Sequence, residues 1–411
     1  MFSKASFHIH NQGRRTMTTN LLLVVFADIP NTAPGKRMHT LARGLSEHGC
    51  NVKLLAPMNF QGTGLEGKEE GIDVAWATNA QESDLHSTAK RIGARLRFYR
   101  LLERELEGGI DGVIFSNPNG DLLPAIRLAN RRSGFTFATY DDLRTFKPDP
   151  STVDYLTFAV SSICDRLIPR MVSACAVIST ALRDRVQKMA PRSKLFLFPP
   201  IVDTNQFRNS QEGRERHRGA YGIKDEILIG YLGTFWTIEG VKVLLEAVAK
   251  VKKTHAKFKV IICGKAHEGL ACDDVEGVIK RLELSDQVIQ KGWLPKEQII
   301  DVMSACDILV APKLADAANV AGMPTKLAEY MSMGKAIVTS RIGDIPFYAS
   351  HGQDCLLCEP GNVQELAGAL HRLLEDNELR VRLSAGARKA AESQFECKTV
   401  SARFLKQMGR A

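Results

Sequence analysis

The 411-residue sequence lacks any apolar run of the roughly 18–20 residues that a membrane-spanning helix requires. Its longest apolar stretches, such as residues 21–27 and 308–312, are much shorter. It also has only nine cysteines, which are too sparse and irregular for a disulfide scaffold and indicate a reducing compartment. Cys355 and Cys358 have the C-x-x-C spacing, but no second pair or histidine set accompanies them, so we interpret them as part of a buried strand.

Several nucleotide and nucleic-acid motifs are absent as well. No G-x-G-x-x-G follows the first predicted strand of either half, and no G-x-x-x-x-G-K-[ST] occurs, which excludes dinucleotide-dependent dehydrogenases and P-loop nucleotidases. Without C2H2 spacing, an RNP-type aromatic run or a block of five lysines and arginines, nucleic acid is not an expected partner. The formal net charge is nevertheless +9, and residues 1–200 hold 26 Lys and Arg against 19 Asp and Glu. Such a basic half favours anionic lipid or phosphorylated small molecules.

The first 18 residues stand apart from the rest of the chain. They contain Lys4, Arg14 and Arg15 but no acidic residue, and they lack the apolar core of a secretory signal. A transit peptide and an upstream start codon, with translation beginning at Met17, both fit this pattern. We expect residues 1–18 to be a disordered extension outside the fold.

From residue 21 onward, short apolar runs alternate with longer helical patterns. Continuous apolar strands that alternate with helices predict βαβ units and parallel sheets. Thirteen strands exceed the eight of a (β/α)8 barrel, so the predicted fold class is α/β, with two doubly wound Rossmann-like domains facing across a cleft. The expected strands are residues 21–26, 52–56, 74–77, 112–116, 135–140, 176–179, 195–198, 227–231, 258–263, 288–291, 307–311, 336–339 and 355–358.

The polar, proline-containing stretch around residues 199–222 interrupts this alternation and predicts the boundary between the domains. We interpret Asp203 and Phe207 as structural, because an aspartate can cap a local turn and a phenylalanine can anchor the linker. The expected division is 19–203 for the first domain, 204–390 for the second and 391–411 for a C-terminal helix, for which we consider a return to the first domain.

The most informative segment is GMPTKLAEYMSMGKAIVTS, residues 322–340. After Pro324, Thr325 is the expected N-cap of a helix that carries Lys326 and Glu329 in its first turn. A helix N-terminus binds phosphate through its unpaired N–H groups, Lys326 adds a positive charge, and Glu329 can accept hydrogen bonds from sugar hydroxyls. The pattern indicates a nucleotide-diphosphate site, with a solvated lysine and glutamate on an ordinary helix as the alternative.

Longer runs carry a resemblance to a known family. The run CDILVAPK…GMPTKLAEYMSMGKAIVTSRIGDIP…GQDCLLCEPGNVQELAGALHRLLEDNELRVRLSAGAR resembles the carboxyl-terminal domain of glycosyltransferase family 4, retaining enzymes with the two-domain GT-B fold. More loosely, PGKRMHTLARGLSEHGCNVKLLAP and AVISTALRDRV…LFPPIVDTNQF resemble its first loop and helix and its interdomain approach. The resemblance covers most of residues 227–405 and implies the GT-B architecture.

The resemblance also implies an activity, that of a hexosyltransferase-type enzyme of cell-surface polysaccharide biosynthesis. A UDP-sugar or GDP-sugar would donate its sugar to a glycan, lipid-linked or small-molecule acceptor, with retention of configuration and without a metal or other cofactor. In the family, a glutamate at the position of Glu329 holds the donor ribose, and the preceding loop approaches the sugar and diphosphate. The expected donor-binding residues are therefore Gly233, Thr234, Gly322, Met323, Pro324, Thr325, Lys326 and Glu329.

Three positions depart from the family pattern. Ala321 stands where many members have a glutamate that contacts the donor sugar, and Thr234 and Glu239 stand where they have an Arg or Lys pair. Since one oriented donor can contribute roughly 10²–10³-fold in rate, we expect Lys326 to act in catalysis in place of that pair, with Lys242 as a weaker candidate. A weakly catalytic GT-B scaffold or binding protein and a same-fold sugar-nucleotide epimerase are the alternatives.

The first domain offers candidates for the acceptor side. Gly35 begins a loop-to-helix transition followed by Lys36 and Arg37, which predict a loop for phosphate or an anionic acceptor, with a capping turn and solvated charges as the alternative. Asp141 and Asp142 stand at the end of a predicted buried strand. The resemblance implies an acceptor-side acid in this region, for which Asp142, and after it Asp141, are the expected residues. We expect no catalytic dyad, because the departing phosphate oxygen can take the acceptor proton.

Residues 85–106 predict a basic amphipathic helix in which Ile92, Leu96, Tyr99 and Leu106 form one stripe beside several lysines and arginines. Such a helix either lies in a lipid interface or packs against a protein core with its cations in solvent. Membrane contact would suit a lipid-linked acceptor. We expect a cytoplasmic protein, either free or peripheral on the cytoplasmic face of the membrane.

Overall fold

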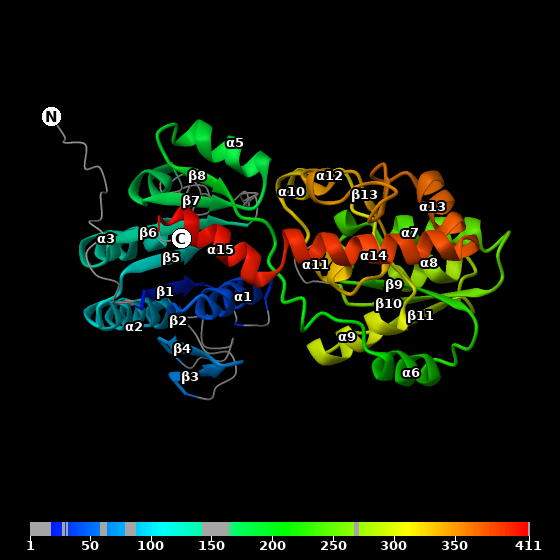
Figure 1. The fold of residues 1–411 in the computed structure, drawn as a ribbon, viewed down its shortest axis with the longest axis horizontal. Helices are drawn as coiled ribbons and strands as arrows, with labels where there is room; N and C mark the ends of the chain where they lie inside the picture. Colours follow the sequence, from blue (N-terminus) through cyan, green and yellow to red (C-terminus); the bar gives the residue numbers. More distant parts are fainter. Residues whose placement is uncertain are drawn as a thin grey trace.

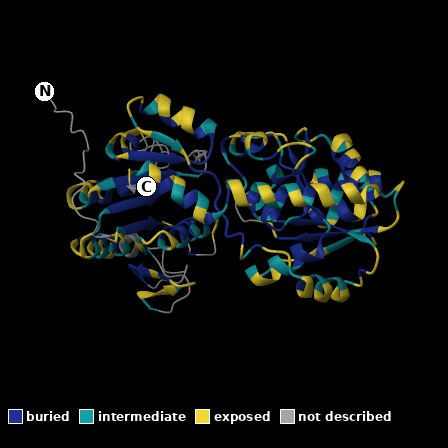
Figure 2. Ribbon diagram, in the orientation of Figure 1, coloured by how far each residue is buried: buried dark blue, intermediate teal, exposed yellow. Residues whose placement is uncertain are grey.

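A computed structural model describes residues 18–26, 29, 32–57, 64–78, 88–141, 163, 166–266 and 271–409. These residues form two α/β domains that lie side by side along the long axis of the molecule (Figure 1). The strands are largely buried between helices whose outer surfaces are exposed (Figure 2). The expected architecture of two Rossmann-like domains is therefore confirmed.

The sheet of the first domain has the order β3-β4-β2-β1-β5-β6-β7-β8. All neighbouring strands pair in parallel except β3 with β4. The sequence does not predict β3, because its residues EGKE lack the apolar side chains of the other strands. The strands are β1 (Asn20–Val25), β2 (Asn51–Ala56), β3 (Glu66–Glu69), β4 (Ile72–Trp76), β5 (Gly112–Ser116), β6 (Phe135–Tyr140), β7 (Ala174–Val177) and β8 (Leu195–Leu197).

The sheet of the second domain is parallel throughout and has the order β11-β10-β9-β12-β13-β14. Its chain order reverses direction between β9 and β12, which is the switch point where open α/β sheets bind ligands at the carboxyl ends of the strands. All six strands coincide with predicted ones to within two residues. They are β9 (Ile227–Leu232), β10 (Phe258–Cys263), β11 (Val288–Lys291), β12 (Ile308–Ala311), β13 (Ala336–Ser340) and β14 (Leu356–Cys358).

Helices cover both faces of each sheet because successive strand residues point to opposite faces. In β1, Leu23 packs with Met38 of α1, whereas Leu22 packs in the same core as Leu102 of α2. The first domain contains α1 (Ala33–Glu47), α2 (Thr88–Glu107), η2 (Gly120–Leu122), α3 (Leu123–Arg132) and α5 (Thr180–Met189). The second contains α6 (Gln211–Ala220), η3 (Thr237–Glu239), α7 (Val241–Val251), α8 (Val275–Arg281), α9 (Lys296–Ala305), α10 (Ala317–Ala321), α11 (Thr325–Ser332), α12 (Ile345–Tyr348), α13 (Val363–Glu375) and α14 (Asn377–Gln394).

The last helix, α15 (Cys397–Gln407), packs against α1 of the first domain (Figure 1). The chain crosses at the linker, where the amide N–H of Val202 donates to the carbonyl of Phe395 at 2.9 Å. Gly44 permits the close approach of α1 and α15, because a Cβ at this position would overlap Ser401. Phe404 then packs its ring against Phe198, with 5.0 Å between the ring centroids.

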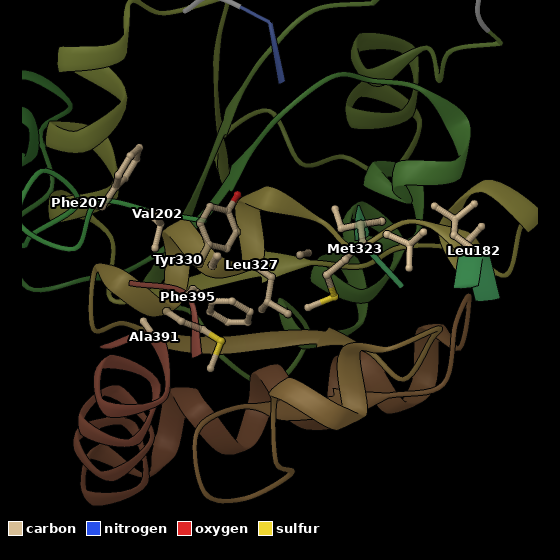
Figure 3. Packing of buried hydrophobic residues seen from close by; sticks show 14 of the residues in the cluster. Leu182, Val202, Phe207, Met323, Leu327, Tyr330, Ala391 and Phe395 are labelled. Atoms are coloured by element: carbon tan, nitrogen blue, oxygen red, sulfur yellow. The ribbon is translucent and has the colours of Figure 1, made fainter. Parts of the chain in front are cut away.

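The linker residues have the structural roles that the sequence predicts. One carboxylate oxygen of Asp203 accepts hydrogen bonds from the backbone N–H groups of Asn205 and Gln206, at 2.9 and 3.2 Å. Its other oxygen forms an ion pair with Arg43 of α1 at 2.6 Å. Phe207 is buried and lies near Val202 and Tyr330 (Figure 3). These contacts fix the path of the chain between the domains.

An apolar core is continuous across the domain interface. It joins Leu182 of α5 to Met323 and Leu327 at the start of α11, and Figure 3 shows Met323 and Leu327 side by side. Beside this core, the hydroxyl of Thr180 donates to Asp344 at 2.5 Å. The start of α11 is thus packed directly against the first domain.

The C-x-x-C pair is buried at β14 as predicted, and burial raises the pKa of the Cys358 thiol to about 12. Among the described residues, no helix has both the length and the apolar character needed to span a bilayer.

Candidate functional site

Two cavities lie between the domains. The first has a volume of about 400 Å³ and the second of about 350 Å³. Thr325 and Lys326 at the start of α11 line both cavities, as does Ala33 at the start of α1. Because Leu232 ends β9 and lines the first cavity, the cleft lies at the carboxyl edge of the second sheet, where α/β ligand sites occur.

The helix start differs by one residue from the sequence prediction. The N-cap of α11 is Pro324, not Thr325, because Pro324 is extended (φ −68°, ψ 118°) and Thr325 is already helical. A proline has no side-chain acceptor, so it forms no capping hydrogen bond to the first turn. The helix therefore begins at the cleft without a side-chain cap, which is a suitable arrangement for an anion.

Lys326 does not extend freely into the cleft. Its Nζ lies 2.7 Å from a carboxylate oxygen of Glu239, and the other oxygen of Glu239 pairs with Lys313. Lys313 also donates to the Oδ1 of Asn319 at 3.1 Å. We call Glu239, Lys313, Lys326 and Asn319 the Glu239 cluster.

The cluster alters one sequence interpretation. In the sequence, Glu239 stands where the family commonly has a cation. In the structure Glu239 pairs with two lysines, Lys313 and Lys326, so positive charge is present at this point in the cleft. Sequence reasoning overlooked Lys313, although it follows β12 by two residues and therefore had to lie near the carboxyl edge of the sheet. Of the two lysines in the cluster, the sequence identifies only Lys326.

The charges of the cluster are strongly coupled. Burial acts to raise the pKa of Glu239, but Lys326 and Lys313 outweigh it and lower that pKa to about 2. Burial lowers the pKa of Lys313 despite the attraction of Glu239. At Lys326 the attraction of Glu239 overcomes the opposing effect of burial, and the pKa is raised. The carboxylate and Lys326 are therefore both charged at neutral pH.

Gly233 allows Lys326 to reach this position. A Cβ at Gly233 would overlap the Nζ of Lys326, which lies 5.1 Å from the ring centroid of Tyr231. Gly233 lines the first cavity. Thr234, predicted beside it, is not among the residues that line either cavity, and its carbonyl instead accepts a hydrogen bond from the Tyr231 hydroxyl at 2.6 Å.

Glu329 is held from the opposite side of the cleft. It forms an ion pair with Lys36 of α1, and the Lys36 Nζ lies 4.7 Å from the ring centroid of Phe207. Glu329 and Lys36 both line the first cavity. The pair therefore bridges the two domains at this cavity.

The predicted loop at Gly35, Lys36 and Arg37 is helical, because Thr32 caps α1 and α1 begins at Ala33. Only Lys36 of the three lines the first cavity, and Gly35 lines neither. The expectation of a loop at this position is wrong.

Arg37 and Asp141 form the first-domain wall of the second cavity. Arg37 is 3% exposed, its Nε lies 3.3 Å from Asp141, and its Nη2 donates to the carbonyl of Phe198. Burial lowers the pKa of Arg37, and Asp141 opposes this. Asp142, the first choice for an acceptor-side acid, lies outside the described residues.

The remaining predicted positions are distributed as follows. Gly322, Met323 and Pro324 line the second cavity beside the Glu239 cluster. Ala321 is buried, and its carbonyl accepts a hydrogen bond from Ser179 of the first domain. Lys242 is exposed on α7 and lines neither cavity, which removes it as a candidate.

Known proteins resemble this chain in sequence and in fold. Residues 213–390 match the family model described as "Glycosyl transferases group 1". Alpha-D-kanosaminyltransferase of Streptomyces kanamyceticus is 24% identical over 249 residues, which cover 59% of this chain and 62% of that protein. D-inositol 3-phosphate glycosyltransferase of Corynebacterium jeikeium (strain K411) is 27% identical over 45% of this chain and 44% of that protein. The match thus spans less than two thirds of these relatives.

Solved structures share the arrangement of both domains. Sucrose-phosphate synthase from Thermosynechococcus elongatus superposes with a TM-score of 0.75 at 15% identity, covering 95% of this chain and 98% of that one. Anabaena HepE in complex with UDP-glucose superposes with a TM-score of 0.70 at 15% identity, covering 95% and 100%. At this identity the comparison establishes the GT-B fold.

Proposed function

This chain belongs, through residues 213–390, to the group 1 glycosyltransferases, and from this premise we propose that it transfers a sugar from a nucleoside-diphosphate sugar with retention of configuration. The observation that carries the proposal is the position of Lys326. It lines both interdomain cavities and is held charged by Glu239 at the N-terminus of α11. A donor that spans the two cavities would place its diphosphate at this charge.

In this proposal the nucleoside occupies the first cavity. Glu329 accepts hydrogen bonds from the ribose hydroxyls, which are the donors that a carboxylate requires. The exposed ring of Trp293 borders the same cavity and offers a flat apolar surface to the base. Because Lys36 already pairs with Glu329, the ribose must displace it.

The transferred sugar would then occupy the second cavity, beside Gly322, Met323, Pro324 and Asn319. Lys326 stabilises the negative charge that develops on the diphosphate as the bond to the sugar breaks. Lys313 adds positive electrostatic potential near the diphosphate, because it pairs with the other oxygen of the same Glu239 carboxylate. This arrangement compensates for the cationic pair that the family commonly has at Thr234 and Glu239.

The acceptor would approach from the first-domain wall of the second cavity, where Asp141 lies. We assign Asp141 and Asp142 to acceptor binding, and the proton of the attacking hydroxyl passes to the departing phosphate oxygen. The name of one relative, a D-inositol 3-phosphate glycosyltransferase, supports a small polyhydroxylated acceptor. A glycan acceptor, as in polysaccharide synthesis, and a lipid-linked acceptor are the other acceptor classes.

Membrane contact through residues 85–106 would be electrostatic rather than insertive. Phe98, Leu102 and Leu106 of α2 are buried in the first-domain core, so this apolar side of the helix is not available to lipid. Its exposed side carries Arg100 and Arg104, together with Leu96 of the predicted stripe, which is 54% exposed. Contact with an anionic membrane is therefore a proposal that rests on these charges and on one exposed apolar side chain.

The function is tested by incubating the purified chain with a panel of UDP-sugars and GDP-sugars and measuring release of the nucleoside diphosphate. We expect release of the nucleoside diphosphate with one donor class, and stimulation of this release by a polyhydroxylated acceptor. NMR spectroscopy of the product should show that the transferred sugar keeps the anomeric configuration it had in the donor. Isomerisation of the nucleotide sugar without release would indicate an epimerase. Neither turnover nor calorimetric binding of any donor would indicate a non-catalytic scaffold and contradict the proposal.

A further inference from the structure

A group of three side chains lies on the second domain, away from the cleft. His255 follows the turn after α7, and His371 and Glu375 lie one turn apart on α13. Their potential ligand atoms all lie within 4.8 Å of one another. The backbone positions are fixed, because the N–H of His255 donates to the carbonyl of Val251 at 2.9 Å and α13 packs against α7.

The distances within this group are unusual for hydrogen bonds. The Nε2 of His371 lies 3.4 Å from one carboxylate oxygen of Glu375, and the Nε2 of His255 lies 3.9 Å from the other. Hydrogen bonds between such atoms are about 2.7–3.2 Å long. Two ligands of one tetrahedral ion, bound at about 2.1 Å, lie roughly 3.4 Å apart. The spacing is thus closer to that of metal ligands than to that of hydrogen-bonded pairs.

The two imidazole rings both present their Nε2 atoms to Glu375. Their centroids are 4.9 Å apart and their planes are nearly perpendicular, at 88°. The Nδ1 atoms of His255 and His371 are buried, and neither has a hydrogen-bond partner among the described residues. The Nε2 atoms are the nitrogens that lie near the carboxylate, and an ion bound to them would leave the ring protons on the Nδ1 atoms.

We propose that His255, His371 and Glu375 bind a divalent transition metal ion, with Zn²⁺ as the expected ion. Two imidazole nitrogens and one carboxylate select this class over Mg²⁺ and Ca²⁺, which prefer oxygen ligands. The Glu375 side chain is 57% exposed and that of His371 is 41% exposed, which leaves a fourth position open to water.

The bound ion would connect the turn after α7 to α13. This site lies at the opposite end of α7 from Glu239, and the 11 residues of that helix extend about 16 Å. It is therefore separate from the proposed diphosphate site. Its expected effect is on the stability of the second domain, because an ion that binds only the folded chain shifts the equilibrium toward that state.

The test uses the full chain, treated with a chelator and dialysed, and titrated with Co²⁺, whose visible absorption reports its coordination geometry. We expect one Co²⁺ per chain with a tetrahedral or five-coordinate spectrum, displacement of Co²⁺ by Zn²⁺, and a rise of a few degrees in Tm with excess Zn²⁺. The same shift should be absent with Mg²⁺.

Variants assign the binding to these residues. His371→Ala and Glu375→Gln should each weaken Co²⁺ binding at least tenfold and abolish the Zn²⁺-dependent rise in Tm. Two controls should retain both: His217→Ala on α6, and His8→Ala with His10→Ala, which removes another closely spaced histidine pair of the sequence. Binding that is unchanged in His371→Ala, or no binding of Co²⁺ by the parent below millimolar concentration, would overturn the proposal.

Discussion

The cleft contains two carboxylates of the second domain, and they differ in what neutralises them. Glu239 is paired with Lys313 and Lys326, both from its own domain. Glu329 is paired with Lys36, which comes from the other domain. The first arrangement does not depend on how the domains are placed, whereas the second exists only while they are close. The charge at the proposed diphosphate position is thus built in, and the ribose position is subject to domain movement.

The difference extends to net charge. Two lysines on one carboxylate leave the Glu239 cluster with an excess positive charge, which an arriving diphosphate can neutralise. The Lys36–Glu329 pair is already neutral, so an arriving ribose has to compete with a lysine. We therefore expect substitutions in the cluster to have the larger effects and substitutions in the pair to have smaller ones.

The largest effect is expected for Lys326→Met. This change removes the cation that lines both cavities, so we expect kcat to fall by roughly 10²–10³-fold, the usual consequence of removing one oriented donor. The affinity for the nucleoside diphosphate should fall with it, while the affinity for the free nucleoside, which lacks the diphosphate, should be retained. Steady-state kinetics and calorimetry with both ligands measure the two effects.

Lys242→Met is the matched control, because Lys242 is an exposed lysine of the same domain that lines neither cavity. It should leave both affinities unchanged. Equal loss of nucleoside and nucleoside-diphosphate affinity in Lys326→Met would mean that Lys326 acts on the nucleoside or on the fold, and the assignment to the diphosphate would be wrong.

The sequence predicts the fold well because strand and helix patterns are local. Every predicted strand occurs. Most of them are apolar runs that are buried on both faces, whereas β8 and β11 are only partly buried. One observed strand, β3, is not predicted. It is held by antiparallel pairing of Glu66–Glu69 with β4 rather than by burial of apolar side chains. Such an edge strand leaves no hydrophobic signal in the chain.

The site is only partly predictable for a different reason. Lys326 and Glu329 were identifiable from the start of one helix, but their partners are distant in the chain. Glu239 is 87 residues away from Lys326, and Lys36 is 293 residues away from Glu329. Position in the sequence does not reveal that Glu239 would gather two lysines, because this depends on the side-chain paths across the sheet edge.

The second prediction is that Glu239→Gln destabilises the chain in a pH-dependent way. The carboxylate has a pKa of about 2 when folded, against 4.5 as its ordinary value, so the unfolded chain binds the proton more tightly between these values. The stabilisation it provides is present above about pH 4.5 and is lost as the pH falls toward 2. Its size at neutral pH is on the order of 3 kcal/mol.

Chemical denaturation of the parent and of Glu239→Gln at several values from pH 7 to pH 3 measures this contribution. The difference in the free energy of unfolding should be constant above about pH 5 and should shrink below it, because the unfolded parent then takes up a proton at Glu239 that the folded parent, with its pKa of about 2, does not bind. A difference that stays constant down to pH 3 would show that the carboxylate is not stabilised by the two lysines.

The smallest effects are expected at the Lys36–Glu329 pair, where the two variants should act in opposite directions on nucleoside binding. Glu329→Gln should weaken binding, because it removes a charged acceptor of the ribose hydroxyls. Lys36→Met should strengthen it by about 2–5-fold, because a partly exposed ion pair is worth roughly 0.5–1 kcal/mol and no longer has to be broken. In the double variant the gain from Lys36→Met should vanish, since the carboxylate for which Lys36 competes is gone. Calorimetry with the free nucleoside measures all three variants, and weaker binding by Lys36→Met alone would show instead that Lys36 contacts the nucleoside itself.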